Sequence, residues 1–217
     1  MNVALLSHTP NPVEVCATAA RRCYSDLDIE DLLIRYTRHE QDEFLKSVLA
    51  RGHLSVLEHA SFTFGIEGIS RACSHQLVRH RIASYSQQSQ RYVSSEGFMW
   101  VTPDSIRGSE ETLDVYQEAM GWLQVAYDNL VFLGIPEEDA RYLIPNAAET
   151  SLVMTMNARE LLHFFNLRCC KRAQWEIREM ADRMLQLCQE VSPVIFKKAG
   201  ASCVSGKCPE GKHGCKK

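Results

Sequence analysis

Residues 68–95 read GISRACSHQLVRHRIASYSQQSQRYVSS and form the most distinctive stretch of the chain. The stretch holds four arginines and two histidines but no Asp or Glu, whereas the whole chain has a formal net charge of −3. Cationic side chains mixed with Ser and Gln donors, with no acid to neutralise them, are typical of a site for a phosphate-bearing ligand. The alternative is a solvated basic face or a surface that binds polyanions without specificity.

Length and composition indicate a single domain of ordinary size, or one large α+β unit, of 217 residues. A hydrophobic content of 45% is sufficient for a core. No apolar run approaches the roughly 20 residues that a membrane-spanning helix needs. The first residues, MNVALLSHTP, are too short and too uncharged for a signal peptide. We therefore expect a cytoplasmic protein without a membrane segment.

The nine cysteines are an odd number, and most are scattered through segments with helical periodicity. This pattern favours reduced thiols over a disulfide framework. We expect a folded domain over residues 1–200 and an extended Cys/Lys/Gly-rich tail over residues 201–217. Zinc binding in this tail is the alternative, and its four candidate ligands are Cys203, Cys208, His213 and Cys215. Because the spacing lacks a CxxC pair, we predict no metal.

Periodicity and turn residues predict strands and helices that alternate along most of the chain. The expected strands cover residues 2–7, 60–67 and 150–156. One helix is expected to begin at Pro12 after an Asn11 cap, two short helices lie within 28–51, and another runs from a Ser70 cap to 79 or 81. In the second half of the chain, helices are expected over 109–133, in a short piece after Pro136, after Asn157, and over 172–191. Residues 82–93 are expected to form a polar loop.

Three local predictions concern possible site residues. A helix from Ser70 would place Gln76, Arg79 and His80 on one face. At the start of the helix after Asn157, Glu160 occupies the capping-box position. Arg168 follows Phe164 and Phe165 and would be costly to bury without a partner anion.

Two further segments leave alternatives open. His163 is either a ligand contact or a satisfied core histidine. The segment GHLSVLEH (52–59) holds two histidines and a glutamate. It allows a metal site, a helix start capped by Ser55, or a ligand role for His53.

Four motifs in the same order resemble those of the flavin-dependent thymidylate synthases. The first is Arg79-His80-Arg81 followed after seven residues by Ser89, the RHRx7S signature. The others are GHLSVLEH (52–59), ARYLIP (140–145) and NARELLHFFNLRCCKRAQWEIR (157–178). The resemblance covers about residues 1–200.

The resemblance implies an α+β fold, with mixed helices around a small antiparallel sheet, assembled as a homotetramer with shared active sites. It also implies reductive methylation of dUMP to dTMP. The carbon would come from 5,10-methylenetetrahydrofolate and the reducing equivalents from NADPH through FAD. The family uses no cysteine nucleophile, and nucleic acid is not a partner. A nucleic-acid-binding module is the rival interpretation, against which the net charge of −3 and the pI near 6.2 weigh.

Carried onto this sequence, the resemblance implies three groups of site residues. The expected FAD contacts are Ser55, Glu58, Arg79, His80, Arg81, Asn157, Arg159 and His163. The expected dUMP shell is Gln76, Arg79, Gln87, Gln88, Ser89, Gln90, Arg91, Arg141 and Arg168. Of the catalytic candidates Arg168, Ser89 and His53, Arg168 would polarise the pyrimidine, and His53 and Tyr92 would stack on the folate or flavin ring. Some members of the family have Glu where Gln87 stands and Asn where His163 stands.

Overall fold

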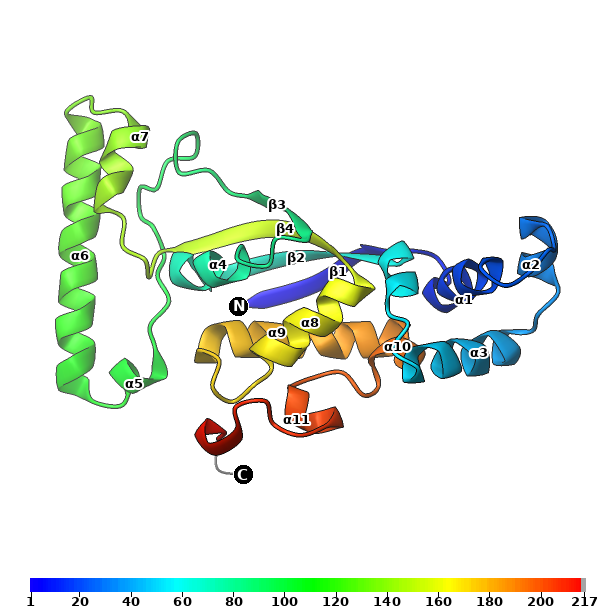
Figure 1. The fold of residues 1–217 in the computed structure, drawn as a ribbon. Helices are drawn as coiled ribbons and strands as arrows, with labels where there is room; N and C mark the ends of the chain where they lie inside the picture. The colour runs from blue at the N-terminus through cyan, green and yellow to red at the C-terminus, as the bar shows by residue number, and fades with distance from the viewer. Residues whose placement is uncertain (216–217) are drawn as a thin grey trace. The chain divides into compact units, whose positions relative to one another are not determined.

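The computed structural model describes residues 1–215, and its chain combines helices with one small sheet (Figure 1). The four strands are β1 (Asn2–His8), β2 (Ser61–Ser70), β3 (Ala83–Gln87) and β4 (Glu149–Asn157), in the order β1-β2-β4-β3. The amide of Ala158 donates to the Ala60 carbonyl, and the amide of Arg71 donates to the Ala148 carbonyl. Residue numbers along β4 therefore fall as those along β2 rise, so this pair is antiparallel. The predicted α+β class is confirmed.

The chain forms two compact units, which we call the first and the second unit. The first unit comprises Met1–Asn2, Ile66–Arg79 and Ser86–Leu152. The second comprises Val3–Gly65, His80–Tyr85 and the residues from Val153 onward. The boundary in the basic stretch falls between Arg79 and His80, so neighbouring motif residues belong to different units.

The second unit combines a set of helices with a buried aromatic cluster. The helices are α1 (Pro12–Arg22), α2 (Ile29–Ile34), α3 (Arg38–Ala50), the 3-10 helix η1 (Ser55–His59), α8 (Ala158–Arg168), α9 (Trp175–Val191), α10 (Pro193–Phe196), α11 (Ser202–Ser205) and η3 (Gly211–His213). Phe62, Phe165 and Phe196 are fully buried, and the ring of Phe196 meets the other two edge-on. In Figure 1, α8 runs beside α9, against which it packs.

The predicted helix starts in the second unit are confirmed only in part. Asn11 stands at the N-cap of α1 and Pro12 begins the helix as predicted, but Asn11 has a left-handed backbone conformation at φ 47° and makes no side-chain cap bond. Ser55 lies inside η1, where Leu54 holds the capping position. Helix α9 begins at Trp175 rather than 172, because the side-chain oxygen of Gln174 accepts the amides of Glu176 and Ile177.

The tail after Gly200 is not extended as expected, because it contains α11 and η3. Arg172 explains part of this order. Its guanidinium forms an ion pair with Glu210 at 2.5 Å and also donates to the carbonyl of His213. Polar contacts of Arg172 therefore order part of the tail, although the tail has few apolar residues that could pack.

The first unit contains α4 (Arg71–Leu77), α5 (Asp104–Arg107), α6 (Glu110–Phe132), α7 (Glu137–Ala140) and η2 (Arg141–Leu143). Ser70 caps α4 as predicted and Ser109 caps α6, each accepting an amide three residues further on. However, α4 ends at Leu77, so the prediction that Gln76, Arg79 and His80 share a helical face was wrong.

Part of the expected polar loop is strand β3. Along Ala83–Gln87 the exposure alternates, with Ser84 and Ser86 exposed and the residues between them partly buried. This period of two is the strand signal that sequence reasoning missed, because Ala83, Tyr85 and Gln87 at the partly buried positions are not a row of large apolar residues. Within the part of the chain that the structure describes, every helix is too short or too polar to cross a lipid bilayer.

Candidate functional site

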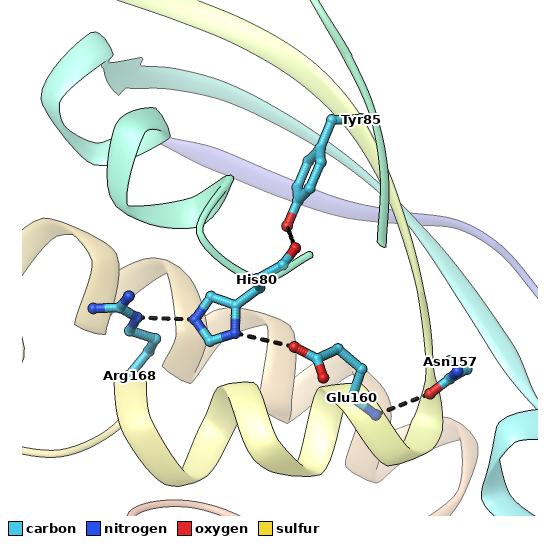
Figure 2. Close-up of polar contacts among 5 residues, drawn as sticks. All are labelled: His80, Tyr85, Asn157, Glu160 and Arg168. Atoms are coloured by element: carbon cyan, nitrogen blue, oxygen red, sulfur yellow. Dashed lines mark hydrogen bonds and ion pairs between the residues drawn. The ribbon is translucent and has the colours of Figure 1, made fainter. Parts of the chain in front are cut away.

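In the second unit, His80, Glu160 and Arg168 form a connected polar group in which His80 and Glu160 are buried (Figure 2). The Nδ1 atom of His80 lies 3.1 Å from Oε1 of Glu160, and its Nε2 atom accepts a hydrogen bond of 3.1 Å from Nε of Arg168. His80 and Glu160 are only 6% and 8% exposed. Both ring nitrogens of this motif histidine are therefore occupied.

The elements around His80 hold it from three sides. The hydroxyl of Tyr85 donates to the His80 carbonyl at 2.8 Å, and the ring of Phe164 meets the imidazole edge-on at 4.9 Å between centroids. The side chain of Asn157 accepts the amide of Glu160, which confirms the predicted helix cap. The carboxylate of Glu160 does not complete a capping box as predicted, since it turns to His80 instead.

Burial is the main cause that lowers the pKa of His80 below its ordinary value, because an imidazolium loses solvation there. The positive charge of Arg168 and the neighbouring His163 act in the same direction, while Glu160 opposes them. The net lowering favours a neutral imidazole at neutral pH. His163 itself is exposed, so its interpretation as a core histidine was wrong.

The other expected flavin residues of the second unit lie at its surface. Glu58, in η1, forms an ion pair with Arg159 of α8. Arg81 is exposed, and within residues 1–215 no carboxylate lies at ion-pair distance from it. His53 and Ser55 line one open depression of about 450 Å³, together with Arg21 and the aromatic rings of Tyr36 and Phe44.

The first unit carries the expected dUMP residues Gln88, Ser89 and Gln90 on one open, polar depression of about 290 Å³. Gln87 does not line it, because its amide donates to the hydroxyls of Ser74 and Thr150 at 3.0 and 3.1 Å. Gln76 lies on α4 and is partly buried. Three consecutive motif residues are therefore presented to solvent while Gln87 is held by its neighbours.

A second cluster in the first unit joins two of the expected phosphate-binding arginines through Glu138 of α7. The Arg91 guanidinium forms an ion pair with the Glu138 carboxylate at 2.8 Å, and Arg141 donates to the Glu138 carbonyl at 3.0 Å. Sequence reasoning missed Glu138, although its position three residues before Arg141 was a signal. Tyr92 is 80% exposed, and the Arg91 guanidinium lies 5.4 Å from its ring.

The donor set fits a phosphate-bearing cofactor. Arg79 and Arg81 are exposed, and the described part of the chain places no carboxylate at ion-pair distance from either. A guanidinium that no carboxylate neutralises is suited to bind a phosphate group, and the first unit offers one in Arg79 and the second unit one in Arg81. A flavin nucleotide carries such a group.

Metal binding is less well supported by the geometry. His80, Glu160 and His163 place ligand-type atoms within 4.8 Å of one another, but both nitrogens of His80 are already hydrogen-bonded. Cys203, Cys208 and Cys215 line an open depression with Cys170, and His213 is not among its lining residues. Within residues 1–215 these thiols do not form a group of three at metal-ligand spacing.

Comparison with known proteins gives the family. Residues 4–194 match the family described as Thymidylate synthase complementing protein. A flavin-dependent thymidylate synthase from Geobacter sulfurreducens is 56% identical over 219 residues, covering 100% of this chain and 94% of the relative. Relatives of the same description from Clostridium tetani and Pyrococcus furiosus are 46% and 42% identical, covering 100% and 97% of this chain and 94% and 90% of the relatives. The resemblance found in the sequence motifs is therefore confirmed, and the chain belongs to the flavin-dependent thymidylate synthases, a family of enzymes.

Proposed function

We propose that this protein converts dUMP to dTMP, with 5,10-methylenetetrahydrofolate as carbon donor and NADPH as reductant through bound FAD. The observation that carries the proposal is the contact between two motif residues, Arg168 and His80, in a partly buried setting. A guanidinium held in one orientation is a suitable electrostatic partner for a pyrimidine on which negative charge develops. The flavin, when bound, supplies the hydride chemistry, and the protein supplies binding and orientation.

The residues divide into two proposed binding sets. Arg79 and Arg81 would bind the phosphates of FAD, with Ser55, Glu58, Asn157, Arg159 and His163 as further contacts. Because the Asn157 side chain already caps α8, its contribution to FAD would be mainly positional. Glu58 and Arg159, now paired with each other, would meet the cofactor as a pair.

The dUMP set would use the polar depression of the first unit. Gln88, Ser89 and Gln90 would contact the nucleotide there, with Gln76 and Gln87 behind them and Arg79 nearby in sequence. Arg91 and Arg141 would bind its phosphate, which would compete with Glu138 for Arg91. Arg168 would polarise the pyrimidine, and His53 and Tyr92 would stack on the folate or flavin ring.

We further propose that the enzyme is a cytoplasmic homotetramer whose active sites are shared between subunits. Helix α6 supports such an assembly because it exposes large apolar side chains: Val125, Trp122 and Phe132 are 52%, 68% and 89% exposed. Scattered apolar exposure is ordinary, but large side chains gathered on one helix mark an interaction surface. Residues 1–200 would suffice for the chemistry, and residues 201–217 would be dispensable.

The direct experiment follows the cofactor and the product together. The purified protein should show a flavin absorption spectrum, which NADPH should bleach under anaerobic conditions. Addition of dUMP and methylenetetrahydrofolate should restore the spectrum and yield dTMP, and omission of dUMP should yield none. A flavin-loaded protein that forms no dTMP with all substrates present would refute the proposal.

A further inference from the structure

We propose that Glu160 is a positioning residue for Arg168, acting through the imidazole of His80. Glu160 is not among the residues expected from the sequence motifs to contact a ligand. The inference rests on the proposed role of Arg168 at the pyrimidine. It is carried by three connected side chains, of which two belong to α8 and the third enters from the segment before β3 (Figure 2).

The hydrogen bonds admit one tautomer of His80. The Nε–H group of Arg168 can only donate, so Nε2 of His80 must present a lone pair to it. The single proton of a neutral imidazole is then on Nδ1, and the Glu160 carboxylate accepts it at 3.1 Å. Glu160 therefore determines which nitrogen remains available to Arg168.

The location of Glu160 supports this assignment. A carboxylate that is only 8% exposed is costly to bury unless it accepts hydrogen bonds. In the first turn of α8 its usual partner would be the capping amide, yet the structure directs it to His80. The Asn157 side chain satisfies the Glu160 amide, so the backbone of this turn is held independently of the Glu160 carboxylate.

The other tautomer of His80, with its proton on Nε2, would break the hydrogen bond between His80 and Arg168. The charged or titratable groups facing His80 are Glu160, Arg168 and His163, all from α8, and the Tyr85 hydroxyl binds its carbonyl. A proton on Nε2 would point an N–H group at the Nε–H group of Arg168, so that two donors would face each other. Arg168 would then lose the acceptor that His80 offers to its Nε–H group.

The test is a double-mutant cycle on flavin-loaded enzyme, measured as kcat and KM for dUMP. Glu160→Leu removes the acceptor and should lower kcat about tenfold with KM changed less than threefold. Glu160→Gln keeps an oxygen that can accept from Nδ1 and should recover most of the loss. In an Arg168→Lys background, Glu160→Leu should change kcat less than twofold, because the contact it supports is already absent.

A matched control is Glu176→Leu, which removes another buried carboxylate from the first turn of a helix in the same unit. This variant should keep kcat within twofold, and its melting temperature reports the purely structural cost. Wild-type kcat in Glu160→Leu, or equal losses in the wild-type and Arg168→Lys backgrounds, would overturn the inference.

A second measurement needs no stable Glu160 variant. In wild-type enzyme labelled with ¹⁵N-histidine, the His80 signal should be that of the Nδ1–H tautomer at neutral pH, assigned by its loss in His80→Gln. An Nε2–H tautomer or an imidazolium would contradict the inference. Failure of the proposed function is separate, since it would leave wild-type enzyme without dTMP formation whatever the His80 tautomer.

Discussion

Two motif arginines are held in contrasting ways in this protein. Arg168 meets a buried histidine, whose own partner is a buried carboxylate. Arg91 forms an ion pair with Glu138, and about half of each side chain is exposed, at 50% and 49%. Buried hydrogen bonds fix a side chain because leaving them unmade is costly, whereas an exposed ion pair is screened and exchangeable. The first arrangement suits catalysis and the second suits capture of a phosphate.

The largest expected effect is on Arg168. Replacing it with Ala removes a charge-assisted hydrogen bond worth roughly 1.5–3 kcal/mol, so turnover should fall about ten- to two-hundredfold. Arg168→Lys should recover only part of the loss, because an ammonium cannot reproduce the planar guanidinium. Flavin content should stay at the wild-type level in both. Unchanged turnover in Arg168→Ala would make this residue structural.

Arg91→Ala should act on substrate binding instead. Loss of one charged contact to the dUMP phosphate should raise KM about tenfold with little change in kcat.

Glu138→Gln frees Arg91 from an exposed ion pair worth about 0–1 kcal/mol, so KM for dUMP should shift by no more than about fivefold. Steady-state kinetics at two salt concentrations would test both. An effect of Arg91→Ala confined to kcat would remove the contrast with Arg168.

The stability of the protein should depend on pH through the buried His80. Because the pKa of folded His80 lies below its ordinary value of 6.5, the unfolded chain binds more protons between the two pKa values. The contribution of neutral His80 is therefore complete above about pH 6.5 and is lost as the pH falls through the lowered value. Melting temperatures from pH 8 to 5 should fall more steeply in wild type than in His80→Gln. Parallel curves would show that His80 is not responsible.

The smallest effect is expected from the tail. Truncation after Gly200 removes the Arg172–Glu210 ion pair, in which both side chains are 48% exposed. Such a pair contributes about 0–1 kcal/mol, so flavin binding should persist and turnover should stay within about threefold. Metal analysis of the full-length protein is the control. Release of zinc together with loss of activity on truncation would replace this expectation by a structural metal site.

Much of the fold could be predicted from local signals. Ser70, Ser109 and Asn157 cap helices as their residue types indicate, because each accepts an amide three residues further on. Strand β3 was missed because its partly buried positions are Ala83, Tyr85 and Gln87, which do not form the row of large apolar side chains that marks a strand. Its pairing comes from the rest of the sheet, which no local window of sequence contains.

The site could be predicted only as a set of residues. The motifs identify His80 and Arg168, but their contact joins positions 88 residues apart, a relation that spacing does not reveal. Glu160 shows the limit most clearly, since the capping-box pattern assigned its side chain a local role and the structure gives it a long-range one. Glu138 was missed although it stands three residues before Arg141, and its ion pair with Arg91, 47 residues away, has no local signal.

The proposed function and the role of Arg168 in it are tested most directly by a single-turnover measurement of dTMP. Flavin-loaded enzyme, reduced without oxygen and mixed with saturating dUMP and methylenetetrahydrofolate, should form nearly one dTMP per flavin. Arg168→Lys should reach the same yield at a rate about tenfold or more lower, since the variant binds substrate but stabilises the developing charge poorly. Absence of dTMP in wild type, or equal rates in the two proteins, would contradict the account.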